Sequence, residues 1–141
     1  MSLFDGYDIS TSGMVAQRTR VKVLSTNIAN AQTTHTPEGG PYVRKKVIFE
    51  DVLQHAKEKP DLNGLAEVKV RAIVNSKAKP FMKFEPDNPD ANKDGYVAYP
   101  NVNPVIEMVD LLEATKSYEA NASAFKSQRD IDTKTLDILK A

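Results

Sequence analysis

Apolar residues near the N-terminus recur with the alternating three- and four-residue spacing of a coiled-coil helix. No proline precedes Pro37, so a helix from about residue 8 to residue 31 can form, roughly 36 Å long. Gly13 lies inside this helix, where glycine costs roughly 1 kcal/mol relative to alanine, so we expect another helix to approach its backbone closely. The series consists of Met14, Val21, Leu24, Ile28 and Ala31, with Gln17 at its one polar position.

The C-terminal segment predicts a second, longer helix. Asn103 and Pro104 have the residue types of an N-cap and a first helical position, and Glu107 and Asp110 place negative charge where the helix dipole favours it. Gly and Pro are absent from residues 105–141, so one helix of roughly 55 Å can form. Its seam begins at Met108 and continues through Leu111, Thr115, Tyr118, Ala122, Phe125, Arg129, Asp132, Leu136 and Leu139, beside a second stripe of Ala120, Ala124, Ile131 and Ile138.

The residues between these helices have strand and turn patterns. Apolar residues alternate with charged ones at 43–49 and 68–74, which predicts two strands, and two shorter candidates are 81–84 and 96–99. A loop or hinge is indicated by the Gly-Gly pair and two prolines of residues 33–41. Polar connections are expected at 55–64 and 87–95.

The predicted fold class is therefore α+β, with long N- and C-terminal helices forming a coiled-coil core and a small β-rich unit between them. We divide the chain into an N-terminal core helix (1–33), a hinge loop with a small outer unit (34–103) and a C-terminal core helix (104–141). A β-rich unit of this size is only marginally stable alone and cannot also cover both helices. Pairing of the helices hides one stripe on each, so we expect neighbouring chains to cover the rest. The alternative is a self-contained antiparallel helical hairpin capped by the β-rich unit.

Composition excludes several functional classes. The chain of 141 residues has 19 Lys+Arg and 19 Asp+Glu, so it lacks the basic excess expected of a nucleic-acid-binding protein. Cysteine is absent, which rules out disulfides and thiolate metal sites. The first 30 residues contain no apolar run long enough for a secretory signal, and no stretch is long enough to span a bilayer. We expect neither Sec-type export nor membrane insertion.

One short motif is similar to the start of a calcium-binding EF-hand loop. Asp90, Asn92 and Asp94 are followed by Gly95, in the spacing of the first ligands and the invariant glycine. Position twelve of the loop is Asn101, where a bidentate Glu is needed, and prolines occupy positions 89 and 100 next to both ends. Because Asp, Asn and Gly also form ordinary turns, we expect a turn and no metal site.

Catalytic chemistry has little support. His35 and His55 lie in polar connections without a metal-ligand partner at helical spacing, and no nucleophile, phosphate-binding or zinc motif is present. The basic run at residues 44–46 is followed by Glu50 and Asp51, so we interpret it as a solvated strand face. We expect no enzyme activity, no catalytic residue and no cofactor.

Several stretches resemble one family. Residues 25–33 (STNIANAQT), with Asn27 and Asn30, resemble the N-N-I-A-N-A-x-T box that closes the first helix of bacterial flagellar axial proteins, the rod and hook subunits. Within that family the rod proteins of the basal body are most similar. That likeness rests on residues 36–42 (TPEGGPY), 46–50 (KVIFE), 89–97 (PDANKDGYV), 99–103 (YPNVN) and 107–121 (EMVDLLEATKSYEAN).

The resemblance implies a structural subunit of the proximal rod that polymerises through its terminal helices into the drive shaft. It implies unfolded export by the flagellar type III apparatus without a cleaved signal peptide, and assembly in the periplasm. The implied partners are copies of the chain and neighbouring rod and adaptor subunits. Another rod or hook subunit and a monomeric coiled-coil interaction module remain alternatives. We expect assembly contacts at Met14, Val21, Leu24, Asn27, Ile28, Asn30, Leu111, Tyr118, Ala122, Phe125, Ile131, Leu136 and Leu139.

Overall fold

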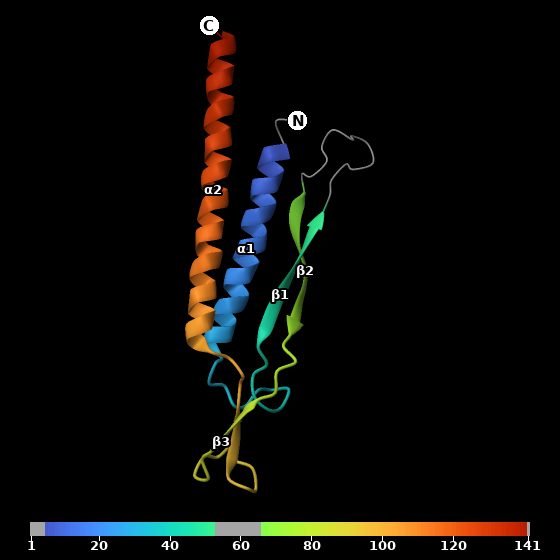
Figure 1. The fold of residues 1–141 in the computed structure, drawn as a ribbon, viewed down its shortest axis with the longest axis vertical. Coiled ribbons are helices and arrows are strands. Elements are labelled where there is room, and N and C mark those ends of the chain that lie inside the picture. Colours follow the sequence, from blue (N-terminus) through green and yellow to red (C-terminus); the bar gives the residue numbers. More distant parts are fainter. Residues whose placement is uncertain (1–4, 53–65, 141) are drawn as a thin grey trace.

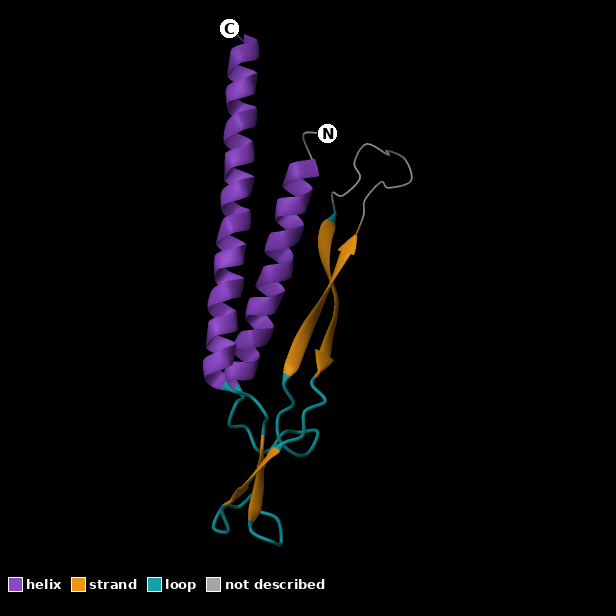
Figure 2. Cartoon of the chain, viewed as in Figure 1, coloured by secondary structure: helices purple, strands orange, loops and turns teal. Residues whose placement is uncertain are grey.

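A computed structural model describes residues 5–52 and 66–140. Two long helices lie side by side, and two β-hairpins accompany them, one beside the helices and one at their lower end (Figures 1 and 2). This arrangement confirms the α+β class. The elements in chain order are α1 (Asp5–Ala29), β1 (Lys45–Val52), β2 (Glu67–Asn75), β3 (Phe81–Phe84), β4 (Tyr96–Tyr99) and α2 (Pro104–Lys140).

The two helices pack antiparallel. Near the start of α1, the Tyr7 ring lies against Phe125 with 4.9 Å between ring centroids. Near its end, Asn27 donates a hydrogen bond to Glu107 at the start of α2. Between these points a Cβ at Gly13 would lie 2.8 Å from Asn121 Oδ1. The expected close approach of a second helix at Gly13 is confirmed.

The predicted start of the second helix is confirmed by its cap. Asn103 Oδ1 accepts hydrogen bonds from the backbone N–H of Val105 at 3.0 Å and of Ile106 at 3.4 Å. These bonds satisfy amides that a helix leaves unpaired in its first turn. The first helix begins at Asp5 and ends at Ala29, slightly earlier at both ends than the expected 8–31. None of the described helices is long and apolar enough to cross a membrane.

The strands form two separate antiparallel sheets of two strands each. The β1–β2 hairpin lies along α1, where Val68 N donates to Ser12 Oγ at 3.2 Å. The register of β1 and β2 shifts between Ile48 and Phe49, which marks a bulge. Within the described ranges, β3 and β4 contact only each other among the helices and strands. The polar connection expected at residues 55–64, with His55, lies outside the described residues.

The apolar core is small. Among described residues, the buried apolar side chains are Ala16, Val23, Leu24, Val97 and Ala114. Two further residues, Asn27 and Glu107, are polar and equally buried. Many large apolar side chains remain exposed on α2 and on both hairpins. A chain with so little buried apolar surface gains limited stability from its own packing.

Candidate assembly surfaces and the buried polar joint

The residues expected to make assembly contacts fall into two groups. On α1, Leu24 and Asn27 are buried inside the protomer, while Met14, Val21, Ile28 and Asn30 are half-buried. On the first half of α2, Leu111, Ala122 and Phe125 are half-buried and Tyr118 is more exposed. Nearer the end of α2, Ile131 is 58% exposed, Leu136 56% and Leu139 77%. The structure therefore brings the first group together within one chain and leaves the last three uncovered.

The uncovered end of α2 continues the face that packs on α1. Among the described residues, the hydrogen bond to α1 that lies nearest the C-terminal end of α2 is the one of 2.6 Å that Tyr7 Oη donates to Asp132 Oδ2. Leu136 and Leu139 follow Asp132 at steps of four and three residues, so they lie on the same face of the helix. Figure 1 shows α2 extending well past the first described turn of α1. No described residue of α1 is available to cover these two leucines.

A second apolar surface occupies the first turns of α2. Val105, Met108, Val109 and Leu112 share one side of the helix by their spacing and are between 50% and 68% exposed. Glu107 and Ala114, which are almost fully buried, point to the other side. Of these four residues, the predicted stripes include only Met108, where the seam begins. The sequence nevertheless contains a pattern that predicts this surface, because apolar residues recur there at the i, i+3, i+4 and i+7 spacing of a helix face.

Beneath these surfaces lies a polar joint, which we define as Asn27 and Glu107, which are buried, together with Tyr42 and Arg44, which are half-buried. Asn27 Nδ2 donates to the Lys45 carbonyl at 2.9 Å and to Glu107 Oε2 at 2.8 Å. Asn27 Oδ1 accepts from Tyr42 Oη at 2.8 Å and from Lys45 N at 3.0 Å. Both donor and acceptor groups of this buried amide are therefore fully used, as burial of a polar side chain requires.

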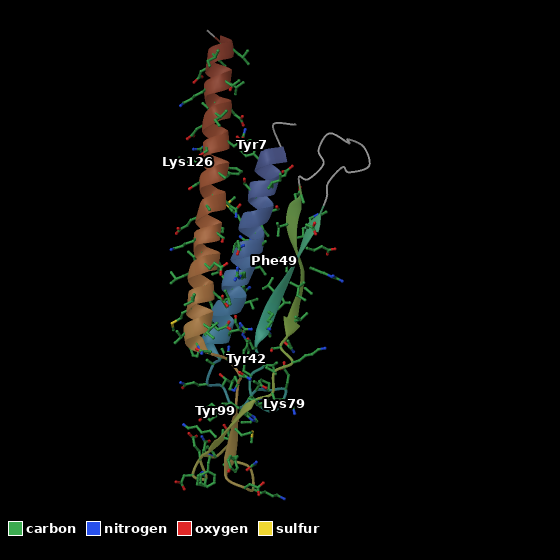
Figure 3. The ribbon with its side chains drawn as sticks, viewed as in Figure 1. Tyr7, Tyr42, Phe49, Lys79, Tyr99 and Lys126 are labelled. Atoms are coloured by element: carbon green, nitrogen blue, oxygen red, sulfur yellow. The ribbon has the colours of Figure 1, made fainter. Side chains whose placement is uncertain are left out.

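The other half of the joint is an ion pair. Arg44 donates through Nε to Glu107 Oε1 at 2.5 Å, and Arg44 Nη2 contacts the same carboxylate oxygen. Burial raises the pKa of the Tyr42 phenol, and the nearby Glu107 carboxylate raises it further. The label of Tyr42 in Figure 3 lies where the helices meet the hairpins. The joint thus ties α1, the entry to β1 and the start of α2 together.

The joint corrects one interpretation of the sequence. The basic run at 44–46 is not uniformly solvated, because Arg44 points inward to the buried Glu107 carboxylate. Lys45 and Lys46 are exposed, as expected for a strand face. Sequence reasoning also missed Tyr42 and Glu107 as partners of Asn27. Their separation of 15 and 80 residues from Asn27 leaves no periodic signal that could pair them.

The Asp90–Gly95 motif forms a turn between β3 and β4. Asn92 Oδ1 accepts from the backbone N–H of Asp94 and of Tyr96, both at 2.9 Å, and Asp90 Oδ2 accepts from Thr34 Oγ1 at 2.6 Å. These hydrogen bonds stabilise the turn. Among the residues that the structure describes, no group of three His, Cys, Asp or Glu side chains is arranged to hold a metal ion.

The base of the same turn is stabilised by Glu85. Its carboxylate pairs with Lys83 Nζ at 2.6 Å and accepts from Asn88 Nδ2 at 3.0 Å and Tyr99 Oη at 2.9 Å. These hydrogen bonds, that of Lys83 first, lower the pKa of Glu85 from 4.5 to about 2. The hydrogen bond to Glu85 in turn raises the pKa of Tyr99 and of Lys83.

Comparison with known proteins places the chain in a family. Residues 8–34 match a family described as flagella basal body rod protein, and residues 93–138 match the C-terminal family of flagellar basal body rod FlgEFG proteins. The flagellar basal-body rod protein FlgC of Borreliella burgdorferi is 39% identical over 99% of both chains. The chain belongs to the FlgC family of flagellar basal-body rod proteins. It is a structural rod subunit of the flagellar basal body.

Other relatives carry the same description. The FlgC protein of Agrobacterium fabrum is 40% identical over 94% of this chain and 92% of its own. That of Bacillus subtilis is 37% identical over 99% of this chain and its own full length. The two family matches cover most of α1 and most of α2, the elements that carry the joint residues Asn27 and Glu107.

Proposed function

We propose that this rod subunit polymerises through its terminal helices and forms part of the proximal drive shaft. In this proposal α1 and α2 (within residues 1–33 and 104–141) belong to the core of the shaft, and the unit of residues 34–103 lies outside it. The protein works as a structural element and not as an enzyme, without a cofactor. Its partners are copies of itself and neighbouring rod and adaptor subunits.

The proposal includes the route to the assembly site. The flagellar type III apparatus exports the chain without a cleaved signal peptide, and the rod forms in the periplasm. Export of an unfolded chain requires modest stability of the free subunit. The small number of buried apolar side chains in the described residues supports such a stability. Neighbouring helices then supply the apolar cover that the free chain lacks.

The observation that carries the proposal is the uncovered end of α2. Leu136 and Leu139 extend the α1-facing stripe beyond Asp132, the residue that is hydrogen-bonded to Tyr7, and both are more than half exposed. Burying a leucine side chain contributes roughly 1.5–3 kcal/mol. Covering both in the shaft offsets part of the entropy lost when the chain is ordered. We expect residues 133–140 to be loosely ordered in the free subunit and helical in the rod.

The test replaces one of these leucines by aspartate. In cells that lack their own copy of the protein, Leu139→Asp should abolish rod assembly, measured as basal bodies per cell and swimming. Lys134→Asp is the matched control, because its separation of five residues from Leu139 puts it on a different side of the helix. The circular dichroism spectrum of the purified Leu139→Asp chain should stay close to that of the wild type. Normal numbers of rods with Leu139→Asp would refute the proposal.

Stoichiometry separates the proposal from the remaining alternative. A monomeric coiled-coil module would bind one partner and stop, whereas a rod subunit adds further copies. Sedimentation of the purified chain together with isolated rods distinguishes the two outcomes. Strict one-to-one complexes, with no incorporation into rods, would favour the module.

A further inference from the structure

The β3–β4 hairpin has one face that carries no charged side chain. Two residues that lie directly opposite each other on paired strands point to the same face of a hairpin, and successive residue pairs alternate between the two faces. Met82 pairs with Ala98 and Phe84 with Tyr96, so these four residues share a face. Phe84 is 61% exposed, Met82 48% and Tyr96 42%. The opposite face also carries an aromatic side chain, Phe81, but it includes the charge of Lys83, which pairs with Glu85.

This apolar face is preorganised. The Phe84 ring packs edge-on against Tyr96 with 5.2 Å between centroids. A Cβ at Gly95 would lie 2.9 Å from Phe84 Cε2 and 3.2 Å from Pro86 Cβ, and Gly95 has a φ of +80°. Only glycine therefore permits both the turn and the position of the ring. A two-stranded hairpin is marginal on its own in water, so a rigid, uncovered aromatic face indicates a surface that another molecule covers.

A hollow with complementary properties lies between α1, β1 and α2. Its volume is about 300 Å³, and an apolar cavity of about 150 Å³ already accommodates a benzene molecule. Val23, Leu24 and Val47 supply apolar lining. The polar lining consists of Arg20, Arg44, Lys45, Lys46 and Asp110. The hollow is thus large enough for one aromatic ring and is bordered by cations.

The charges of the two surfaces are opposite. Arg44 pairs with Glu107, and Arg20 with Asp110 and Glu113, so Lys45 and Lys46 are the cations of the hollow without an ion pair in the described part of the chain. Beside Phe84, the turn carries Asp87, Asp90 and Asp94 against one cation, Lys93. Neither Asp87 nor Asp94 forms an ion pair with any described residue.

We infer that the β3–β4 hairpin of one copy inserts Phe84 into the α1–β1–α2 hollow of a neighbouring copy, with its acidic turn against Lys45 and Lys46. The occupant is a second copy because β3 and β4 touch no other described helix or strand of their own chain, while each chain carries both halves of the pair. Two different surfaces joined in this way make a heterologous contact, which builds either a closed ring or an open helical filament. The inference rests on the proposed function and adds a contact outside the helical core.

Cross-linking tests the contact directly, because the natural chain contains no cysteine. Two singly substituted chains, Phe84→Cys and an epitope-tagged Val47→Cys, are produced together in cells that lack the natural copy. Isolated basal bodies are treated with a short bismaleimide, and the tagged product is analysed on a gel. We expect a dimer of one tagged and one untagged chain. Phe81→Cys replaces Phe84→Cys in the control, since Phe81 is 64% exposed on the opposite face of the same strand.

The outcomes are distinct. A dimer with Phe84→Cys and at least a fivefold smaller yield with Phe81→Cys supports the contact. Equal yields, or assembled rods without a dimer, overturn it while leaving the proposed function intact. If Phe84→Cys prevents rods from forming, Tyr96→Cys on the same face replaces it. The yield of its cross-linked dimer is then compared with that of Phe81→Cys and interpreted in the same way. Normal rods with Leu139→Asp would instead refute the proposed function.

Charge reversal supplies a second readout. Asp87→Lys alone and Lys46→Asp alone should each lower the number of basal bodies per cell, by up to roughly fivefold for an exposed ion pair. The double variant should restore the number to within twofold of wild type. Lys77→Asp, an exposed lysine that does not line the hollow, is the control and should have no effect. A double variant at least as impaired as the worse single variant overturns the contact.

Discussion

Replacing Glu107 by alanine should destabilise the subunit strongly, because Glu107 is the centre of the polar joint. The carboxylate accepts hydrogen bonds from Asn27 and Arg44 and is only 1% exposed. Its removal leaves the Arg44 guanidinium without its partner and one Asn27 donor unsatisfied. Breaking a buried ion pair in this way costs roughly 3–5 kcal/mol.

The expected loss is large relative to the total stability. Native domains are stable by roughly 5–15 kcal/mol, and the few buried apolar side chains of this chain place it at the low end. For a chain of this length, each kcal/mol changes the melting temperature by roughly 3–4 °C. Glu107→Ala should therefore lower the melting temperature by roughly 10–20 °C or leave the chain unfolded at 25 °C.

The assay is thermal melting of the purified chain followed by circular dichroism at 222 nm. Glu113→Ala is the matched control, since Glu113 also pairs with an arginine across the helices but its side chain is 64% exposed. An exposed pair contributes roughly 0–1 kcal/mol, so the control should melt within about 4 °C of wild type. Equal melting temperatures for Glu107→Ala and Glu113→Ala would refute the assignment of Glu107 to a structural joint.

Three further predictions concern the hairpin turn and the free subunit. Gly95→Ala should disturb the fold around its site more than Gly39→Ala does, as measured by nuclear magnetic resonance. Both glycines have a positive φ, but of the two only Gly95 would place a Cβ within 4 Å of another atom. The folded-state pKa of Glu85 lies below its ordinary 4.5, so its stabilisation of the hairpin is present above about pH 4.5 and is lost as the pH falls toward 2. Glu85→Gln should remove that pH dependence, and an unchanged acid profile would contradict it. In the free chain, backbone amides of residues 107–114 should exchange with deuterium more slowly than those of 133–140, and uniform exchange along α2 would contradict the proposed loose end.

Local patterns determined the elements of this protein. The three- and four-residue spacing predicted both helices, alternation predicted the strands, and Asn103 with Pro104 predicted the start of α2. Each of these signals depends on residues within a few positions of one another, so the sequence expresses it directly. Gly13 also predicted a close contact with another helix, because a glycine inside a helix is unfavourable unless such a contact requires it.

Only the tertiary structure decided how these elements meet. Asn27 and Glu107 lie 80 residues apart and become hydrogen-bonded only when α1 and α2 pack in one antiparallel register. That register also turns Arg44 inward, which a run of three basic residues does not indicate. The division of the strands into one hairpin along α1 and one free of the helices likewise depends on packing between distant segments. Periodicity shows which face of an element is apolar, but the partner of that face depends on contacts far apart in the chain.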